Sequence, residues 1–323
     1  MYISFDDGSN WNKFQLNLPI VPITDLAIKN DNLIAATQGR SFWMIDDLTP
    51  MHQLTSSLVQ EDVILFKPQD SYRMGGGNGR TSKNEGTNHP GGVAINYFIK
   101  EKDAKEPVSL QIYDSNDVLI KTFSTDPNKE KKEAKLTLEN GNNIFYWDMM
   151  YPGAEKVKGM ILWWASLNGP MALPGNYKVT LTMGETSKSQ NFTILKNPIS
   201  ETNLADATAQ FDFINDINTK VTEIHKALKN VKKVRVQVTA LQKSIKDKEN
   251  HTELLDYAAS LLKEMTVVEE TLYQTKSKSG QDPLNFPIRL NNKLAHLNSL
   301  TRIGSYAPTQ QAIDFKNEIN KEI

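Results

Sequence analysis

The hydrophobic pattern of this 323-residue chain changes its period at Asn197 and Pro198, and this change is the strongest constraint on the fold. Before it, apolar and polar residues alternate, as at 177–182, which follow a turn-forming stretch at 174–176. From residue 200 onward, apolar residues recur every three or four positions. A half-buried strand has a period of two residues, whereas an amphipathic helix has a period of 3.6. The sequence therefore predicts a multidomain β + α protein, with the β part first.

The β part has its most regular pattern between residues 93 and 197. Six runs with the composition of strands are separated by turn-forming residues: 94–99, 108–114, 118–123, 144–148, 173–182 and 189–194. Six or seven short strands within about 100 residues are typical of an immunoglobulin-like β-sandwich. Trp147 occupies an alternating position in one of these runs, so we expect its side chain to pack in the core.

The α part, residues 198–323, contains four helical patterns. The first has two interleaved heptad series: Ile217, Ile224, Val231, Val238 and Ile245, and Ile214, Val221 and Leu228. This pattern predicts a helix of about 40 residues. A second helix is predicted over 254–272, a third after Pro287 and a fourth after Pro308. Because short links favour antiparallel neighbours, we expect an antiparallel α-helical bundle.

The first 55 residues predict three short strands, at 24–28, 33–37 and 41–45, joined by polar turns. A sheet this small has two open edges and cannot bury both of its faces. We therefore expect further strands to complete it. They would come from the upstream part of a longer parent protein, of which this chain is a fragment, or from a partner chain.

The most distinctive motif of the chain comprises Ser4, Asp6, Gly8 and Trp11. Aspartate and glycine favour a tight turn, and the indole ring can pack beneath it. These four residues match Ser-x-Asp-x-Gly-x-x-Trp, and the motif resembles the Asp-box, or BNR repeat, of sialidases and sortilin-type propellers. In that family the box is a structural hairpin between propeller strands and is not catalytic.

Further segments extend the resemblance to bacterial BNR-repeat proteins with a sortilin-like β-propeller, which are commonly labelled glycosyl hydrolases. Residues 36–50 are similar to their last blade, 174–181 to their Ig-like domain and 287–294 to their C-terminal helices. The resemblance implies four regions: terminal β-propeller blades at 1–55, a glycine-rich linker at 56–92, an Ig-like β-sandwich at 93–197 and an α-helical bundle at 198–323.

The same resemblance implies that the chain is a non-catalytic structural and interaction region. The parent protein would be exported: secreted, periplasmic or on the cell surface. The implied partners are the missing blades or a partner chain that pairs with the N-terminal strands, together with a protein or glycan ligand. The alternative is an accessory part of a glycoside hydrolase, whose active site would lie in missing upstream blades.

Two adjacent tryptophans, Trp163 and Trp164, are candidates for a carbohydrate contact, because aromatic rings stack on sugar rings. If residues 160–164 are extended, the two side chains point in opposite directions. One of the two rings would then be exposed or at a domain contact. Core packing and a carbohydrate contact both remain open for this pair.

Other sites are not supported by the sequence. The glycines at 75–79 lack the spacing of a phosphate-binding loop, so we interpret this stretch as a hinge-like loop. The five histidines, including His89 in a loop, lack metal-binding spacing, and there is no cysteine. We expect no catalytic residue, metal or cofactor.

Binding to nucleic acid or to a membrane is not expected either. Acidic residues flank the basic cluster at 229–235, which we interpret as a solvated helix face, and the net charge is -1. The chain contains no apolar run near the roughly 18 residues of a transmembrane helix.

Overall fold

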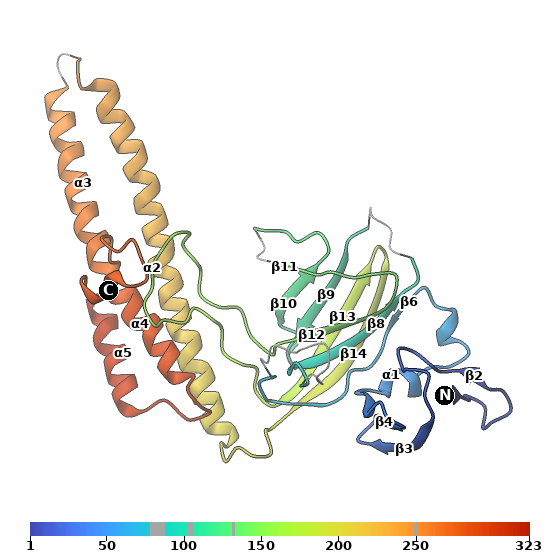
Figure 1. Cartoon of the computed structure of the whole chain (residues 1–323). Coiled ribbons are helices and arrows are strands. Elements are labelled where there is room, and N and C mark those ends of the chain that lie inside the picture. Colours follow the sequence, from blue (N-terminus) through green and yellow to red (C-terminus); the bar gives the residue numbers. More distant parts are fainter. Residues whose placement is uncertain (78–87, 102–105, 131–132, 249–250) are drawn as a thin grey trace.

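The computed structural model describes residues 1–77, 88–101, 106–130, 133–248 and 251–323, and it shows a mixed β and α protein. Two small sheets at the N-terminus lie beside two central sheets, and four of the five described α-helices follow these sheets in the chain (Figure 1). The mixed β and α class predicted from the sequence is therefore confirmed. Within the described residues, no helix combines the length and apolar character needed to cross a membrane.

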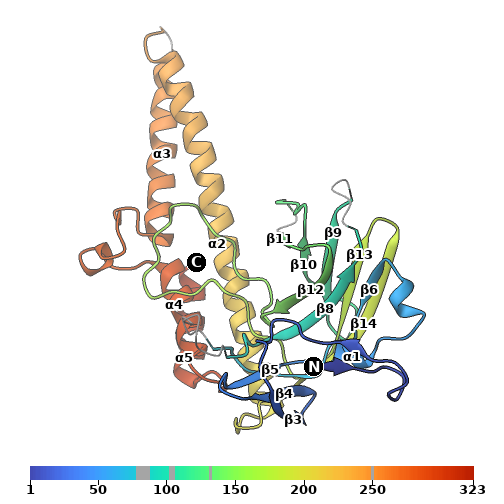
Figure 2. The same ribbon diagram turned by 45° about the vertical axis from the view of Figure 1, so that its right-hand side comes forward.

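The larger central sheet has six strands in the order β11-β10-β9-β13-β14-β7, and it curls like half of a barrel (Figures 1 and 2). Its strands are β7 (Ser71–Tyr72), β9 (Val108–Tyr113), β10 (Leu119–Ser124), β11 (Ala134–Lys135), β13 (Gly175–Met183) and β14 (Thr186–Leu195). β13 and β14 form the hairpin that the sequence predicts after residue 174. The two short outer strands are parallel to their neighbours: β7 pairs with β14, and β11 pairs with β10.

The second central sheet has the order β12-β8-β6 and shares a hydrophobic core with the first. Its strands are β6 (Val63–Leu65), β8 (Val93–Ile99) and β12 (Gly141–Trp147). Alternate residues of β13, such as Val179 and Leu181, are fully buried in this core. Trp147 is also fully buried, with its ring centroid 5.8 Å from that of Tyr177. The predicted core position of Trp147 is confirmed.

The segment expected as a glycine-rich linker, 56–92, contributes to both central sheets. β6 pairs with β8, and β7 pairs with β14. The backbone also turns sharply where this segment enters β8: Gly92 has a φ of +80°, and a Cβ atom there would lie 2.1 Å from the carbonyl oxygen of Trp147. Residues 78–87 of the glycine-rich stretch lie outside the described residues.

The helical part has one long helix, α2 (Leu204–Ile245), of 42 residues. The side chain of Asn203 caps its start by accepting a hydrogen bond from the backbone N–H of Asp206. The other helices of this part are α3 (Thr252–Leu272), α4 (Leu290–Thr301) and α5 (Gln310–Glu322), with a short 3₁₀ turn η2 (Asp282–Leu284). The four predicted helices are therefore present, and the long one has nearly the predicted length.

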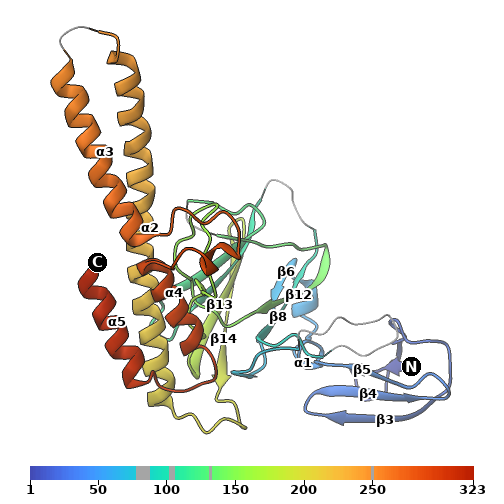
Figure 3. The same cartoon turned by 60° about the vertical axis from the view of Figure 1, so that its left-hand side comes forward.

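α3 and α4 both run antiparallel to α2, one beyond the other along its length (Figures 1 and 3). The first half of α2 packs with α4 and α5 around buried residues that include Ile217, Val221 and Leu294. Leu228 is the last residue of α2 in this core. The far part of α2 is accompanied by α3, and the pair projects from the rest of the molecule (Figures 1 and 3). We call this projection the arm, and it comprises residues 229–248 and 251–272.

An irregular segment, residues 148–174, connects β12 to β13 and lies against the helices (Figure 1). Ala154, Met160 and Leu167 pack into the helical core. The side chain of Asn292 on α4 accepts from the backbone N–H of Trp163 and donates to its carbonyl, at 2.7 and 2.9 Å. This segment therefore joins the sheets to the bundle.

The N-terminal part forms two small antiparallel sheets, β1 (Tyr2–Ile3) with β2 (Asn12–Lys13), and β3-β4-β5. The strands of the second are β3 (Ile23–Lys29), β4 (Asn32–Thr37) and β5 (Phe42–Ile45), and they match the three predicted strands. Asn30 and Asp31, with φ of 50° and 61°, form the two-residue turn between β3 and β4. A short helix α1 (Thr49–His52) and a 3₁₀ turn η1 (Leu58–Gln60) lead on to β6.

Candidate interaction site

The three-stranded β3-β4-β5 sheet leaves most of its surface exposed. In β3, six of the seven residues are exposed, so neither face of this strand is covered. β3 and β5 are the two outer strands, and no further strand pairs with either of them among the described residues. Unpaired N–H and C=O groups at such edges are templates for another strand.

Apolar side chains are also exposed on both N-terminal sheets and on the loops between them. Large apolar residues that are more than half exposed are Tyr2, Phe5, Trp11, Leu16, Ile20, Leu26, Ile28, Phe42 and Met44. Phe42 and Met44 lie on one face of β5, and Leu26 and Ile28 on one face of β3. The strand register places these two pairs on opposite faces of the sheet, so each face carries exposed apolar side chains. Exposed apolar surface of this extent is typical of an interaction site.

The four residues of the Asp-box motif lie together in the turn between β1 and β2. The Ser4 hydroxyl donates to Asp6 Oδ1 at 2.8 Å and accepts from the backbone N–H of Gly8 at 2.7 Å. The Trp11 indole N–H donates to the Gly8 carbonyl at 3.0 Å. A Cβ atom at Gly8 would lie 3.6 Å from the indole, so the ring packs directly on this glycine.

The Asp6 carboxylate is the acceptor on which this turn depends. It accepts from the backbone N–H and the side-chain amide of Asn10, at 2.8 and 2.6 Å. These bonds to Asn10, together with that from Ser4, hold the pKa of Asp6 below its usual value. An ionised, fully bonded carboxylate is suited to maintaining the turn rather than to acid–base catalysis.

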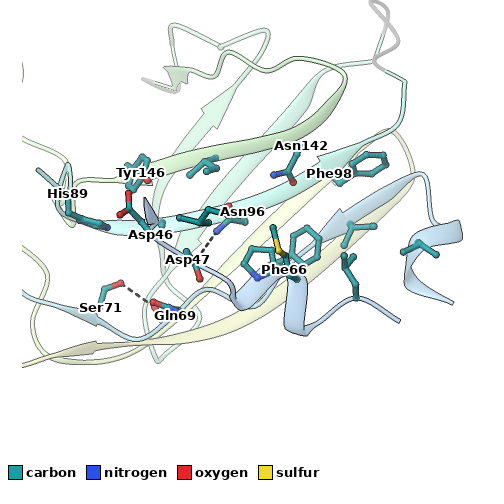
Figure 4. A pocket seen from close by; sticks show the side chains of 18 residues that line it. Asp46, Asp47, Phe66, Gln69, Ser71, His89, Asn96, Phe98, Asn142 and Tyr146 are labelled. Carbon is teal, nitrogen blue, oxygen red and sulfur yellow. Dashed lines mark hydrogen bonds between the residues drawn. The ribbon is translucent and has the colours of Figure 1, made fainter. Parts of the chain in front are cut away.

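A cavity of about 610 Å³ lies between the N-terminal part and the outer face of the β12-β8-β6 sheet. One wall comes from residues 45–54, which run from the end of β5 through α1. The opposite wall comes from alternate residues of β8 and β12 (Figure 4). The lining is mostly apolar and includes Phe66 and Phe98. Its polar members are Asp46, Asp47, Gln69, Ser71, His89, Asn96, Asn142 and Tyr146.

A hydrogen bond connects the two walls of this cavity. The side-chain amide of Asn96, on β8, donates to Asp47 Oδ2 at 3.1 Å (Figure 4). The other oxygen of Asp47 accepts from the backbone N–H of Thr49. Burial raises the pKa of Tyr146, and the carboxylates of Asp46 and Asp47 raise it further. Asp47 is therefore occupied in fixing the start of α1 and its contact with the sheet.

The two candidate tryptophans lie in segment 148–174, against α4. Residues 160–164 are irregular rather than a strand. Trp163 is half-buried, whereas Trp164 is 74% exposed and has a φ of +49°. Their ring centroids are 6.1 Å apart with planes inclined at 56°. His296 Nδ1 lies 2.7 Å from the carbonyl oxygen of Trp164 and helps to hold this bend.

No group of three or more potential metal ligands occurs in the described part of the chain. Two members of the basic cluster on α2 form ion pairs, Lys229 with Glu155 and Arg235 with Glu269, at 2.5 and 2.9 Å.

Sequence reasoning found the Asp-box turn and the tryptophan pair but missed the cavity. The cavity is built from three separate stretches of chain: 45–71, 89–98 and 142–146. One local signal existed, because Asn96 is a polar residue within a strand that is otherwise almost entirely apolar.

Comparisons with known proteins do not place the chain in a family. No protein-family model matches it, and neither the curated proteins nor the solved structures gave a match.

Proposed function

We propose that this chain is the non-catalytic C-terminal structural and interaction region of an exported BNR-repeat protein with a sortilin-like propeller. The observation that carries the proposal is the β3-β4-β5 sheet, with both faces of β3 exposed and apolar side chains on the outside. A sheet of this size gains stability only when other strands or layers cover it. In this proposal it is the last blade of a propeller, and the missing blades pair with its edges.

Two further observations support the proposal. The turn at Ser4, Asp6, Gly8 and Trp11 is held by its own hydrogen bonds, which suits a structural box between blade strands. The two central sheets share one core around the buried Trp147, which suits an Ig-like domain after the propeller. The parent protein would be secreted, periplasmic or on the cell surface.

The second candidate function is an accessory role in a glycoside hydrolase whose active site lies in the missing blades. The exposed Trp164, with Trp163 beside it, favours this alternative because it offers an aromatic surface to a sugar ring. Replacing Trp164 by alanine would then weaken binding of the chain to an insoluble polysaccharide. The same replacement would leave a purely structural region unaffected.

The test of the first proposal is amide hydrogen exchange in two proteins: the 323-residue chain and the same chain extended by its in-frame upstream coding sequence. We expect the edge amides of β3 and β5 to exchange at least about 100-fold more slowly in the extended protein, because new strands bond to them. The amides of β13, already paired on both sides, are the internal control. Equal exchange of β3 and β5 in the two proteins would contradict the proposal.

A further inference from the structure

Two half-buried arginines, Arg73 and Arg302, line a pocket between the larger central sheet and the helical bundle. The pocket has a volume of about 320 Å³, and we call it the arginine pocket. Arg73 directly follows β7, and its backbone N–H donates to the Leu195 carbonyl on β14 at 2.8 Å. Arg302 directly follows α4. One cation of the pocket therefore comes from the sheets and the other from the helices.

Both guanidinium groups are held by the same stretch of segment 148–174. Arg73 Nε donates to the Ala172 carbonyl at 2.8 Å, and Arg302 Nη2 donates to the Gly169 carbonyl at 2.6 Å. Each arginine makes one longer contact to this stretch, at 3.5 and 3.4 Å. A guanidinium group has five N–H donors, so after these two bonds three donors of each arginine remain for a ligand.

Neither arginine pairs with a carboxylate among the described residues. Burial lowers the pKa of both guanidinium groups, and only at Arg73 does a described residue, Tyr177, oppose this shift. A nearby carboxylate would raise both pKa values. Arg235, which is also half-buried, has such a partner in Glu269 at 2.9 Å. Because burying an unpaired charge is costly, an anion in the arginine pocket would be stabilised by both cations.

A second, smaller pocket of about 100 Å³ adjoins the first and shares Arg73, Asn197 and Ser305 with it. Its lining adds a third basic residue, Lys196. Neither lining contains an aspartate or a glutamate among the described residues. A hollow lined by charges of one sign concentrates ions of the opposite sign, so this region attracts anions.

We propose that the arginine pocket is a binding site for a phosphate group, which Arg73 and Arg302 contact together. Arginine forms paired, charge-assisted hydrogen bonds to phosphate oxygens. A phosphate monoester carries a charge of about -1.5 to -2 at pH 7, so it can neutralise two guanidinium groups. The bound group would connect the residue after β7 to the residue after α4. It would therefore also stabilise the contact between the larger central sheet and the bundle.

Asn197→Asp is the sharpest variant for testing this site, because it adds a carboxylate to the lining with almost no change in size. Asn197 Oδ1 accepts from the backbone N–H of Ile199 at 3.1 Å, and an aspartate oxygen can accept the same bond. Asn176→Asp is the matched control. It adds the same charge at an exposed residue outside both pockets, whose Oδ1 also accepts a hydrogen bond.

The measurement is isothermal titration calorimetry of the full chain with inorganic phosphate, with sodium chloride keeping the ionic strength constant. We expect the dissociation constant to rise at least about tenfold in Asn197→Asp and by less than about twofold in Asn176→Asp. Circular dichroism and the urea midpoint of both variants verify that they are folded. A wild-type chain that binds no phosphate would overturn the proposal, and so would equal weakening in the two variants.

A second pair of variants removes a cation instead of adding an anion. Arg302→Gln should raise the dissociation constant for phosphate at least about tenfold. Arg289→Gln, at the exposed residue that precedes the same helix, should change it by less than about twofold. Unchanged binding in Arg302→Gln would contradict the assigned contact.

Phenyl phosphate distinguishes the two sources of the phosphate group. The lining of the arginine pocket also includes the apolar residues Met171, Phe211 and Ile214. Tighter binding of phenyl phosphate than of inorganic phosphate would identify a phosphate ester with an apolar substituent as the ligand. Equal or weaker binding would identify free phosphate. This proposal does not depend on the N-terminal sheets.

Discussion

Strands β3 and β13 show how similar local patterns lead to different environments. Both follow the pattern expected of a strand, and both pair in antiparallel hairpins with tight turns. In β13, Tyr177, Val179 and Leu181 are buried. In β3, Leu26 and Ile28 are more than half exposed. The difference teaches that a strand can be specified by its own residues, while its burial depends on what covers it.

The covering layers explain this difference. β13 lies inside a six-stranded sheet with strands on both sides and a second sheet across the core. β3 is an outer strand of a three-stranded sheet. The following predictions test the contrast between the two environments, beginning with the largest expected effect.

Matched leucine-to-alanine variants should separate the two strands most clearly. Leu181→Ala in β13 removes a fully buried side chain and should lower the free energy of unfolding by about 2–5 kcal/mol, through lost burial and a cavity. Leu26→Ala in β3 removes a side chain that is 53% exposed and should cost less than about 1 kcal/mol. Urea denaturation measures the free energy of unfolding of both variants. Similar losses in the two would contradict the predicted difference between the strands.

Matched glycine-to-alanine variants test the backbone in the same way. Gly92 and Gly39 have nearly equal φ angles, +80° and +79°, so alanine is strained at both sites by about 1–2 kcal/mol. At Gly92 the new Cβ also meets the Trp147 carbonyl, whereas at Gly39 no atom of the described residues lies within 4 Å. We expect Gly92→Ala to lower the melting temperature clearly more than Gly39→Ala. Equal shifts would show that the close approach at Gly92 relaxes without cost.

His225 provides a pH-dependent test of burial in the helical bundle. Its ring is fully buried, with Nδ1 2.5 Å from the Glu155 carbonyl oxygen and Nε2 3.3 Å from the side-chain nitrogen of Asn291. Burial lowers the pKa of His225 below its usual value of 6.5, and the positive charge of Lys229 lowers it further. The contact with the Glu155 carbonyl and the Glu155 carboxylate partly oppose this shift. The unfolded chain therefore binds the proton more readily than the folded chain, so stability is complete above about pH 6.5 and falls as the pH drops below it.

The measurement for this prediction is the urea midpoint as a function of pH for the wild type, His225→Gln and His52→Gln. We expect the slope below pH 6.5 to flatten in His225→Gln alone, because His52 is exposed at the surface. A wild-type midpoint that is constant from pH 7 to pH 5 would contradict the prediction.

The smallest expected effect concerns the Asp-box turn. The depressed pKa of Asp6 means that its contribution is complete above the usual pKa of 3.8 and is lost as the pH falls through the folded value. Asp6→Asn should speed hydrogen exchange at the amide of Asn10, because a neutral acceptor bonds more weakly. Asp7→Asn, a neighbouring exposed change, is the control. Equal exchange rates of the Asn10 amide in the two variants would show that the Asp6 carboxylate does not stabilise the turn.

Most regular elements could be predicted from the sequence because their signals are local. The turn at Asn30 and Asp31 and the heptads of α2 act over a few residues, and the structure has these elements within a few positions of the expected bounds. The Asp-box turn belongs to the same class, since all of its hydrogen bonds lie within residues 4–11.

The remaining features depend on contacts between distant residues. β6 has three consecutive buried residues and therefore no alternation, because it faces the core on one side and the cavity on the other. Residues 160–164 have the apolar composition of a strand, but the side chain of Asn292 bonds both the N–H and the carbonyl of Trp163. Neither the surroundings of β6 nor the contact between Asn292 and Trp163 can be seen in the local sequence pattern. The cavity was missed for the same reason.

The long helix α2 has a mechanical consequence. At 1.5 Å per residue it is a rod of about 63 Å, and its first half packs against α4, α5 and segment 148–174. Leu228 is its last residue in that core, and Lys229 still pairs with Glu155 of the segment. A sideways force at the far end of the arm would act as a lever on the packing contacts at the base of α2. Ala154 and Leu167 pack in this core and belong to the segment that connects β12 to β13. A force applied at the tip of the arm would therefore also act on this connection to the sheets.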